Sequence, residues 1–167
     1  MPTPSEVYEA GERKKEENMA FRAFLKGVAN PDELDEQFRK LHDELFTDYD
    51  CCACNNCCRI YAVALRMDEA ESIAEYLGMS TQAFVDEYLF QTSAGGYGID
   101  GPCPFLRAED GKCVIHECKP TVCRNYPHTN QPDRMGSLLN IISLTEECPV
   151  VYEMIEGLKR IYSFRSG

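Results

Sequence analysis

The alternation of apolar and polar residues predicts helices near both ends of the chain. Residues 5–26 are typical of one helix, and a second helix is expected to begin at Pro31, because proline suits the first turn of a helix. The apolar residues of this second helix recur at intervals of four, three and four positions and share one face; they are Leu34, Phe38, Leu41 and Leu45. A further helix from about Pro149 has its own apolar face, formed by Val151, Met154, Ile155, Leu158 and Ile161.

Shorter elements are predicted in the middle of the chain. A short apolar run with β-branched residues at positions 59–65 predicts a buried strand. Two helices are expected to follow it. Asp68 and Glu71 form a capping-box pattern at the start of the first helix, and Gly78 is suited to end it. Ser80 is suited to cap the second helix.

Turn-forming residues dominate the next part of the chain. Residues 92–101 contain four glycines and no periodicity, which indicates an irregular connection. Residues 103–115 predict a short β-hairpin, because Asp110-Gly111 is a favoured hairpin turn. Together these patterns predict an α+β fold that is mostly helical.

The charge balance narrows the range of partners. Lys and Arg total 17 against 28 Asp and Glu, which gives a formal net charge of −11. Because phosphate groups repel an acidic chain, we expect no nucleic-acid partner and no membrane partner. The acidic N-terminal helices either only shield the core or also dock a basic protein partner, and the sequence does not choose between these two roles. We expect a cytoplasmic protein, since the sequence shows neither a secretory pattern nor an apolar stretch long enough to span a bilayer.

Cysteine is the residue with the most uneven distribution. All ten cysteines follow residue 50 in a chain of 167 residues. Thiols seldom form disulfides in a reducing cytoplasm, so metal binding or redox chemistry is the expected use. We therefore predict an acidic helical segment over residues 1–48, packed on a cysteine-cluster metal-binding domain over residues 49–167, in a single compact domain overall.

The densest cysteine cluster has the spacing of metal ligands. Residues 51–58 read Cys-Cys-Ala-Cys-Asn-Asn-Cys-Cys, which contains the pattern Cys-x2-Cys-x2-Cys-Cys. Thiolates three positions apart can face one ion while the backbone between them donates hydrogen bonds to the sulfurs. The neighbours Cys57 and Cys58 are expected to point in different directions. Either two centres then lie side by side, or one member of this pair is not a ligand.

This local cluster lacks a fourth ligand of its own. The bacterial ferredoxin run is Cys-x2-Cys-x2-Cys-x3-Cys-Pro, and Tyr61 occupies the position of its last cysteine. Tyr61 also interrupts the radical-enzyme pattern Cys-x3-Cys-x2-Cys that would begin at Cys54. A fourth ligand must come from farther along the chain, where the remaining thiols are Cys103, Cys113, Cys118, Cys123 and Cys148.

Several motifs in a fixed order resemble one known family. The chain continues with Cys-Pro-Phe-Leu at 103–106, Cys-Val-Ile-His at 113–116, Lys-Pro-Thr-Val-Cys-Arg-Asn-Tyr-Pro at 119–127 and Cys-Pro at 148–149. This order resembles the bacterial and archaeal cysteine-cluster (CxxCxxCC) proteins, which are described as zinc- or iron-chelating and are often labelled iron-sulfur-cluster-containing. The resemblance covers about residues 49–150.

The resemblance implies eight cysteine ligands, which suit two four-cysteine centres or one such centre with a separate reactive set. They are Cys51, Cys54, Cys57, Cys58, Cys103, Cys113, Cys123 and Cys148. Arg59 and Arg124 each follow a cluster cysteine, and we expect their guanidinium groups to donate hydrogen bonds that offset the negative charge of the centre. Cys52 and Cys118 lie outside the family pattern and are expected to be spectators.

Two residues depart from the family pattern. Lys119 stands where the family has arginine, and lysine keeps the positive charge but lacks the planar fork of donors. His116 stands where the family usually has tyrosine. We expect His116 to be a hydrogen-bonded neighbour of the site rather than an additional ligand.

The sequence leaves the metal and the biological role open. Four thiolates leave the same net charge on Zn(II) as on an oxidised 4Fe-4S cluster, so charge does not choose between them. The ferredoxin-like triplet and the Cys-Pro steps favour an iron-sulfur cluster, whereas the wide separation of the ligands favours structural zinc. The leading hypothesis is thus a metal-binding protein with an iron-sulfur cluster, and structural zinc is its alternative.

Two enzymatic hypotheses accompany it. One is a redox or protein-modifying enzyme that uses the cluster, although the sequence contains no recognisable catalytic motif. The other is a reactive thiol at Cys52 or Cys118, with His116 or His128 as its base.

Overall fold

The contacts within the computed structural model, which describes residues 1–167, divide the chain into two compact units. The helical unit comprises Met1–Asp50 and Pro127–Gly167, and the cysteine unit comprises Cys51–Tyr126. The fold is mostly helical with one small sheet, which confirms the predicted class. The sequence prediction grouped residues 127–167 with the cysteine cluster, whereas in the structure these residues pack with the N-terminal helices.

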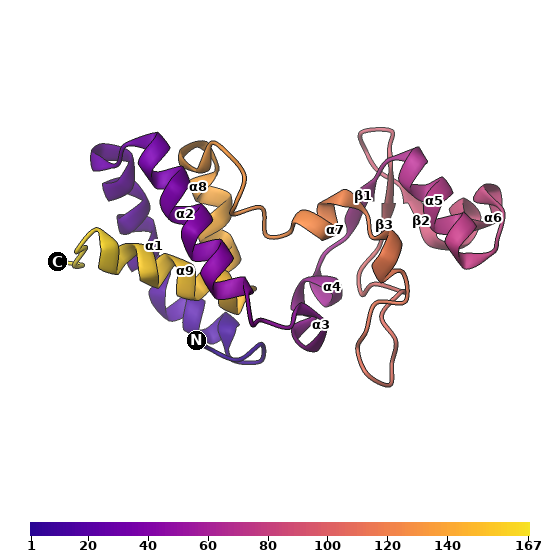
Figure 1. The fold of residues 1–167 in the computed structure, drawn as a ribbon, viewed down its shortest axis with the longest axis horizontal. Coiled ribbons are helices and arrows are strands. Elements are labelled where there is room, and N and C mark those ends of the chain that lie inside the picture. The colour runs from indigo at the N-terminus through magenta and orange to yellow at the C-terminus, as the bar shows by residue number, and fades with distance from the viewer. The chain divides into compact units, whose positions relative to one another are not determined.

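Four helices form most of the helical unit (Figure 1). They are α1 (Val7–Val28), α2 (Pro31–Phe46), α8 (Arg134–Ser143) and α9 (Pro149–Ile161), and a 3-10 turn, η2 (Leu144–Glu146), joins α8 to α9. The predicted helix at 5–26 and the one beginning at Pro31 are confirmed, as is the helix from Pro149. None of the helices combines the length and the apolar character that a membrane span needs.

The start of α2 shows why the chain turns there. The Asn30 side-chain oxygen accepts hydrogen bonds from the backbone N–H groups of Asp32 and Glu33 at 3.0 and 3.1 Å. Proline at the first helical position needs no such partner, since it has no N–H group. Asn30 and Pro31 together reduce the number of backbone N–H groups without a hydrogen-bond partner in the first turn of the helix.

The sequence pattern missed α8, which begins after a left-handed residue. Asp133 has φ 61°, and its carboxylate caps the helix by accepting a hydrogen bond from the Gly136 N–H at 3.1 Å. Asp35 of α2 accepts from the backbone N–H groups of Asp133 and Arg134, each at 2.8 Å. The N-terminus of α8 is thus held by a carboxylate that lies about 100 positions earlier in the chain, a contact that no local pattern predicts.

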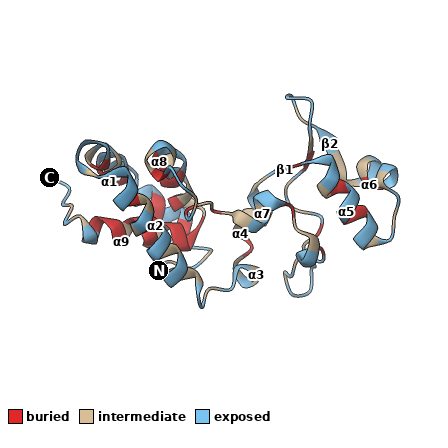
Figure 2. Ribbon diagram, turned by 45° about the horizontal axis from the view of Figure 1, so that its top comes forward, coloured by how far each residue is buried: buried red, intermediate tan, exposed pale blue.

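The apolar faces of these helices form the core of the helical unit, as Figure 2 shows by the buried residues of α2, α8 and α9. Its fully buried large side chains include Phe21, Leu25, Leu34, Phe38, Leu138, Ile141, Met154, Ile155 and Leu158. Of the predicted stripe on α2, Leu34 and Phe38 are buried while Leu41 is half-buried. Ile161, predicted on the buried face of α9, is instead 51% exposed because it is the last residue of that helix.

Truncation of this core should be costly. Phe38→Ala is expected to lower the free energy of unfolding by about 3–5 kcal/mol, because it removes a ring that is 0% exposed and leaves a cavity. Leu139→Ala is the matched control, since Leu139 is 52% exposed on α8 and its loss should change stability by less than about 0.5 kcal/mol. Denaturant unfolding followed by circular dichroism measures both, and equal effects would contradict this description of the core.

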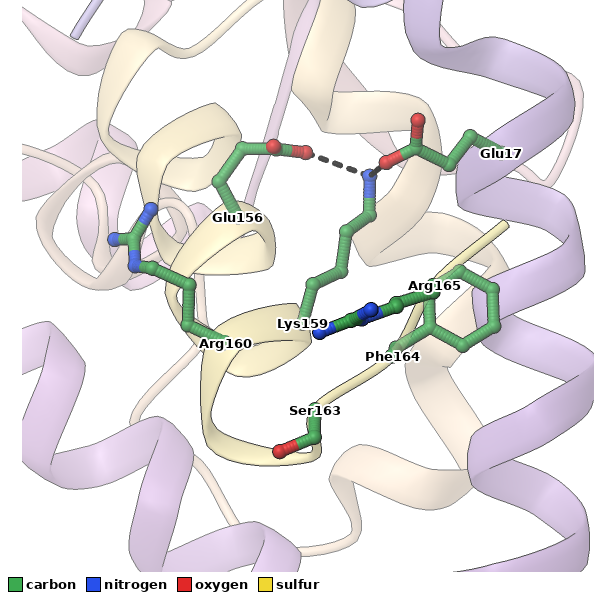
Figure 3. Close-up of a pocket in the computed structure, with 7 residues that line it drawn as sticks. All are labelled: Glu17, Glu156, Lys159, Arg160, Ser163, Phe164 and Arg165. Carbon is green, nitrogen blue, oxygen red and sulfur yellow. Dashed lines mark hydrogen bonds and ion pairs between the residues drawn. The ribbon is translucent and has the colours of Figure 1, made fainter. Parts of the chain in front are cut away.

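A buried lysine links α9 to α1. The Lys159 side chain is 6% exposed, and its Nζ lies 2.6 Å from a carboxylate oxygen of Glu17 and 2.6 Å from one of Glu156 (Figure 3). The hydrogen bond from Lys159 is the main reason that the pKa of Glu17 lies below its usual value. A cavity of about 300 Å³ adjoins this ion pair, but its charged groups largely pair with one another and it contains no thiol.

The cysteine unit consists of short elements. In chain order they are α3 (Cys51–Cys54), α4 (Asn56–Ile60), β1 (Val63–Leu65), α5 (Met67–Leu77), α6 (Thr81–Tyr88), β2 (Leu89–Gln91), β3 (Tyr97–Ile99), the 3-10 turn η1 (His116–Cys118) and α7 (Thr121–Asn125). The three strands form an antiparallel sheet in the order β1-β3-β2. In register, Ile99 lies opposite both Val63 and Leu89.

The sheet differs in detail from the sequence prediction. The strand predicted over residues 59–65 is confirmed only for Val63–Leu65, because α4 continues to Ile60. The connection predicted over residues 92–101 contains the central strand β3. Glycine-rich composition concealed this strand, since its β-structure depends on the two neighbouring strands rather than on its own residues.

The first of the two helices that follow β1 ends as predicted but begins differently, whereas the second begins as predicted. Gly78 adopts φ 71° at the end of α5, and the Ser80 hydroxyl caps α6 by accepting from the Ala83 N–H at 3.1 Å. The capping box predicted for Asp68 and Glu71 is wrong. Glu69 is the residue that reaches back, because α5 begins two residues earlier than the pattern suggested.

The segment predicted as a hairpin over residues 103–115 is a loop with one antiparallel bridge. Leu106 pairs with Cys113, and the Val114 N–H donates to the Phe105 carbonyl at 2.8 Å. The predicted turn is present, with Gly111 at φ 69°. We refer to this segment as the 103–115 loop.

Candidate metal centre

Nine of the ten cysteines lie in the cysteine unit. Cys51, Cys52 and Cys54 are on α3, Cys57 and Cys58 on α4, Cys103 and Cys113 on the 103–115 loop, Cys118 at the end of η1 and Cys123 on α7. Cys148 belongs to the helical unit, where it is buried and precedes α9. The thiols of the cysteine unit are half-buried apart from Cys51, which is exposed.

The small apolar core of the cysteine unit positions the 103–115 loop. Phe105 and Ile115, each 2% exposed, belong to this core, and Cys103 and Cys113 pack against its edge. The Cys103 N–H donates a hydrogen bond to the carbonyl of Cys58 at 2.8 Å. Core packing and this backbone bond thus bring a thiol of α4 beside a segment that lies 45 positions later in the chain.

The vicinal pair on α4 is closer than the sequence suggested. The Sγ atoms of Cys57 and Cys58 lie 4.0 Å apart. In a tetrahedral site with Zn–S bonds of about 2.3 Å, two sulfurs lie about 3.8 Å apart, so neighbouring side chains do not diverge here as expected. The hydrogen bond from Cys57 lowers the pKa of the Cys58 thiol to about 6, against the opposing effect of burial. Cys58 is therefore largely a thiolate at neutral pH.

Three other thiols are held in the neutral form. Burial raises the pKa of Cys103 and of Cys113. Burial and the negative charges of Cys58, Cys103 and Cys113 raise the pKa of Cys123 to about 12. The charges of these four groups act on one another's pKa values across three separate segments, α4, the 103–115 loop and α7. We call Cys58, Cys103, Cys113 and Cys123 the thiol quartet.

Lys119 is the cation that faces the thiol quartet. Its positive charge favours the thiolate forms of Cys58, Cys113 and Cys123, although burial outweighs that effect in the last two. The sequence prediction placed this role on Arg59 and Arg124, both of which are exposed. In the structure, the Arg124 guanidinium donates to the backbone carbonyl of Lys119 at 2.8 Å and so supports the segment that carries the lysine.

Glu69 is a supporting residue that sequence reasoning missed. One carboxylate oxygen accepts from the Arg66 N–H at 2.9 Å and the other from the Thr121 N–H at 2.8 Å. Burial raises the pKa of Glu69, but these backbone hydrogen bonds outweigh it and the pKa lies below its usual value. One side chain thus joins the first turn of α5 to the first turn of α7, the helix that carries Cys123.

Removing this carboxylate should loosen α7. In Glu69→Ala, hydrogen exchange at the Thr121 and Arg124 amides is expected to become about tenfold faster or more, because a hydrogen bond to a charged acceptor contributes about 1.5–3 kcal/mol. Glu71→Ala, which removes an exposed carboxylate from the same helix, is the control and should leave α7 unchanged. Equal exchange rates in the two variants would show that Glu69 does not hold α7.

The remaining predicted participants have different surroundings. Cys52 and Cys118, expected as spectators, each influence the pKa of Cys113 or respond to its charge, so both lie near the thiol quartet. His116 is exposed and makes no side-chain hydrogen bond, which differs from the expected hydrogen-bonded neighbour. His128 lies in the helical unit.

The donor set suits a thiophilic metal. No three His, Cys, Asp or Glu side chains are already grouped at metal-ligand spacing, so the sulfurs have to move closer to share one centre. Sulfur donors at the edge of an apolar core, one of them already ionised and a lysine charge nearby, are the chemistry that zinc and iron-sulfur centres use. Hard cations such as magnesium prefer oxygen ligands and do not fit these residues.

Comparison with known proteins identifies a family. No curated protein and no solved structure matches the chain. One family model does, and it carries the description "CxxCxxCC: Putative zinc- or iron-chelating domain". Its match extends over residues 50–149 and so includes the cysteines from Cys51 to Cys148. Because this match spans more than half of the chain, the protein belongs to the CxxCxxCC family of zinc- or iron-chelating domains.

Proposed function

We propose that the cysteine unit binds one metal centre through the thiol quartet. The observation that carries this proposal is the 2.8 Å backbone hydrogen bond from Cys103 to Cys58, beside a loop whose Cys103 and Cys113 pack on one apolar core. The raised pKa of Cys123, at about 12, agrees with it. A metal cation would replace the protons of three thiols and relieve the repulsion among four thiolates. Lys119 would offset part of the remaining negative charge.

The proposed centre would serve as a cross-link between segments. The four cysteines come from α4, the 103–115 loop and α7, and the apolar core beside them contains only eight buried residues. Small folds with thin cores commonly depend on metals or disulfides. Binding free energy would therefore appear largely as stability of the cysteine unit.

We infer that the centre is an iron-sulfur cluster, with a single zinc ion as the second candidate. The Cys-Pro step at Cys103, a member of the thiol quartet, favours the cluster, whereas the ferredoxin-like triplet at Cys51, Cys54 and Cys57 lies outside the quartet. The wide separation of the quartet cysteines along the chain favours a single zinc ion. The remaining predicted ligands within the cysteine unit, Cys51, Cys54 and Cys57, leave room for a further centre in this proposal.

Anaerobic purification of the full chain tests these proposals. Metal analysis should find stoichiometric iron with labile sulfide, and the visible spectrum should show sulfide-to-iron absorption that bleaches on reduction. Stoichiometric zinc with a colourless protein would replace the cluster by a zinc site and keep the metal-binding proposal. A chain that carries neither metal and takes up neither on reconstitution would refute metal binding by this protein.

A further inference from the structure

Asn55 occupies an unusual position within the cysteine cluster. It lies between α3 and α4 with a left-handed backbone, at φ 43° and ψ 18°. Only 4% of the residue is exposed, and its side-chain oxygen is buried without a hydrogen-bond partner. Both features are unfavourable for a residue that only connects two helices. Other contacts of Asn55 must therefore hold it in place.

The Asn55 amide joins two segments that carry cysteines. Its Nδ2 atom donates to the carbonyl of Cys52 at 3.2 Å and lies 3.5 Å from the carbonyl of Gly111. Cys52 belongs to α3, and Gly111 lies at the turn of the 103–115 loop, two residues before Cys113. One side chain thus bridges the 51–58 segment and the loop.

Gly111 permits this approach for a reason beyond its backbone angle. A Cβ atom at position 111 would lie 2.5 Å from Asn55 Nδ2, well below the 3.0 Å that real Cβ contacts observe. Gly78 and Gly95 have similar left-handed angles, φ 71° and φ 81°, yet a Cβ atom at either would meet nothing within 4 Å. A methyl group at position 111 would therefore displace the Asn55 amide, in addition to the strain from φ.

We propose that Asn55 and Gly111 form a positioning lock for the metal centre. The lock holds the 51–58 segment against the 103–115 loop, so that Cys58 and Cys113 reach the same ion or cluster. Asn55 is a positioning residue and not a ligand in this scheme. The inference rests on the proposed function, because it assigns the lock a role in assembling the thiol quartet.

Three variants of the full chain isolate the lock. Asn55→Gly removes the amide while allowing the left-handed backbone, and Gly111→Ala introduces the methyl group that meets the amide. The double variant removes the amide and adds the methyl group, which then has room. Gly78→Ala is the matched control, because it carries the same φ strain without a close contact.

The first measurement is a cobalt(II) titration of the metal-free chain under anaerobic conditions. Thiolate-to-cobalt absorption monitors the binding. Asn55→Gly and Gly111→Ala should each weaken cobalt binding by about 10- to 100-fold, the range typical of residues that orient ligands, and shift the absorption bands. Gly78→Ala should bind cobalt like the natural chain even if its thermal midpoint falls. If the cobalt affinity of every variant, Gly78→Ala included, falls in proportion to the decrease in its thermal midpoint, the positioning role is overturned.

Denaturant unfolding of the metal-free variants is the second measurement, and it does not depend on metal. The double variant should lose less stability than the sum of the two single variants, because the single changes act on one contact. Additive losses would refute the lock whatever the cobalt result. Non-additive losses in a chain that binds no cobalt would leave the contact in place but overturn both its role at a metal centre and the proposed function.

Discussion

Replacing Cys123 by serine is expected to abolish the metal centre and to destabilise the cysteine unit. Cys123 is the member of the thiol quartet whose pKa responds to the other three, so its sulfur faces the proposed centre. Serine keeps the size of the side chain but supplies a hydroxyl, which is a poor ligand for zinc or iron at neutral pH. A centre with three thiolates and an open position binds metal more weakly and is open to water.

The expected size of this effect is large because metal binding and folding are linked. Metal content after purification should fall by about tenfold or more, and the thermal midpoint of the cysteine unit should fall with it. Metal analysis and thermal unfolding of the same preparation provide the two readouts. Stripping the natural chain with a chelator should give the same low midpoint as Cys123→Ser.

Cys118→Ser is the matched control for this substitution. Cys118 is also half-buried and lies near Cys113, but it falls outside the thiol quartet. Its replacement should leave metal content unchanged. Loss of metal in Cys118→Ser, or full metal content in Cys123→Ser, would require a different set of ligands.

Metal affinity should rise steeply with pH. Cys58, with a pKa of about 6, is already ionised near pH 8, whereas the raised pKa values keep Cys103, Cys113 and Cys123 protonated there. Binding to all four thiolates must then release about three protons. The apparent affinity should accordingly increase by about 1,000-fold per pH unit between about pH 7 and pH 8.5.

The direction of this pH dependence follows from the protonation state of the thiols that bind metal. Metal requires thiolates, so conditions that favour protonated thiols weaken binding, and affinity falls as the pH falls. Below about pH 6, the protonation of Cys58 adds a fourth proton to the count. Competition with a chelator of known pH dependence measures the slope, and calorimetry in two buffers of different ionisation enthalpy counts the protons.

A shallow pH dependence would contradict the structural account. A slope near one would mean that most of the quartet thiols are already ionised, or that fewer than four of them bind. Cys123→Ser offers a check, since the proton count should fall by about one in any residual binding.

Local sequence patterns predicted much of the fold correctly. The apolar stripe of Leu34 and Phe38, the proline start at Pro31 and the glycine stop at Gly78 act within one or two helical turns, so the sequence contains the whole interaction. The Asp110-Gly111 turn was predictable for the same reason. The patterns failed for β3 and α8, because a partner strand stabilises one and Asp35 of a distant helix holds the other.

The candidate site, like the fold, could be predicted from the sequence only in part. The order of the cysteine motifs, which runs through residues 50–149, was sufficient to recognise the family and the chemistry of its ligands. It did not single out Lys119, whose charge favours the thiolate form of Cys58, among the cations next to cysteine-containing segments. It also missed Glu69, whose contact with Thr121 joins residues 52 positions apart.

The sequence by itself determined that this chain is a mostly helical, cysteine-rich member of a metal-chelating family, because residue type and spacing define helices, turns and ligand chemistry locally. Only the tertiary structure decided which cysteine-containing segments lie side by side. Cys58 comes close to Cys103 through a backbone hydrogen bond and through the packing of Phe105 in the core. Neither contact can be inferred from the spacing of the cysteines in the sequence. Contacts between remote segments depend on how the core packs, and that is decided by the whole chain at once.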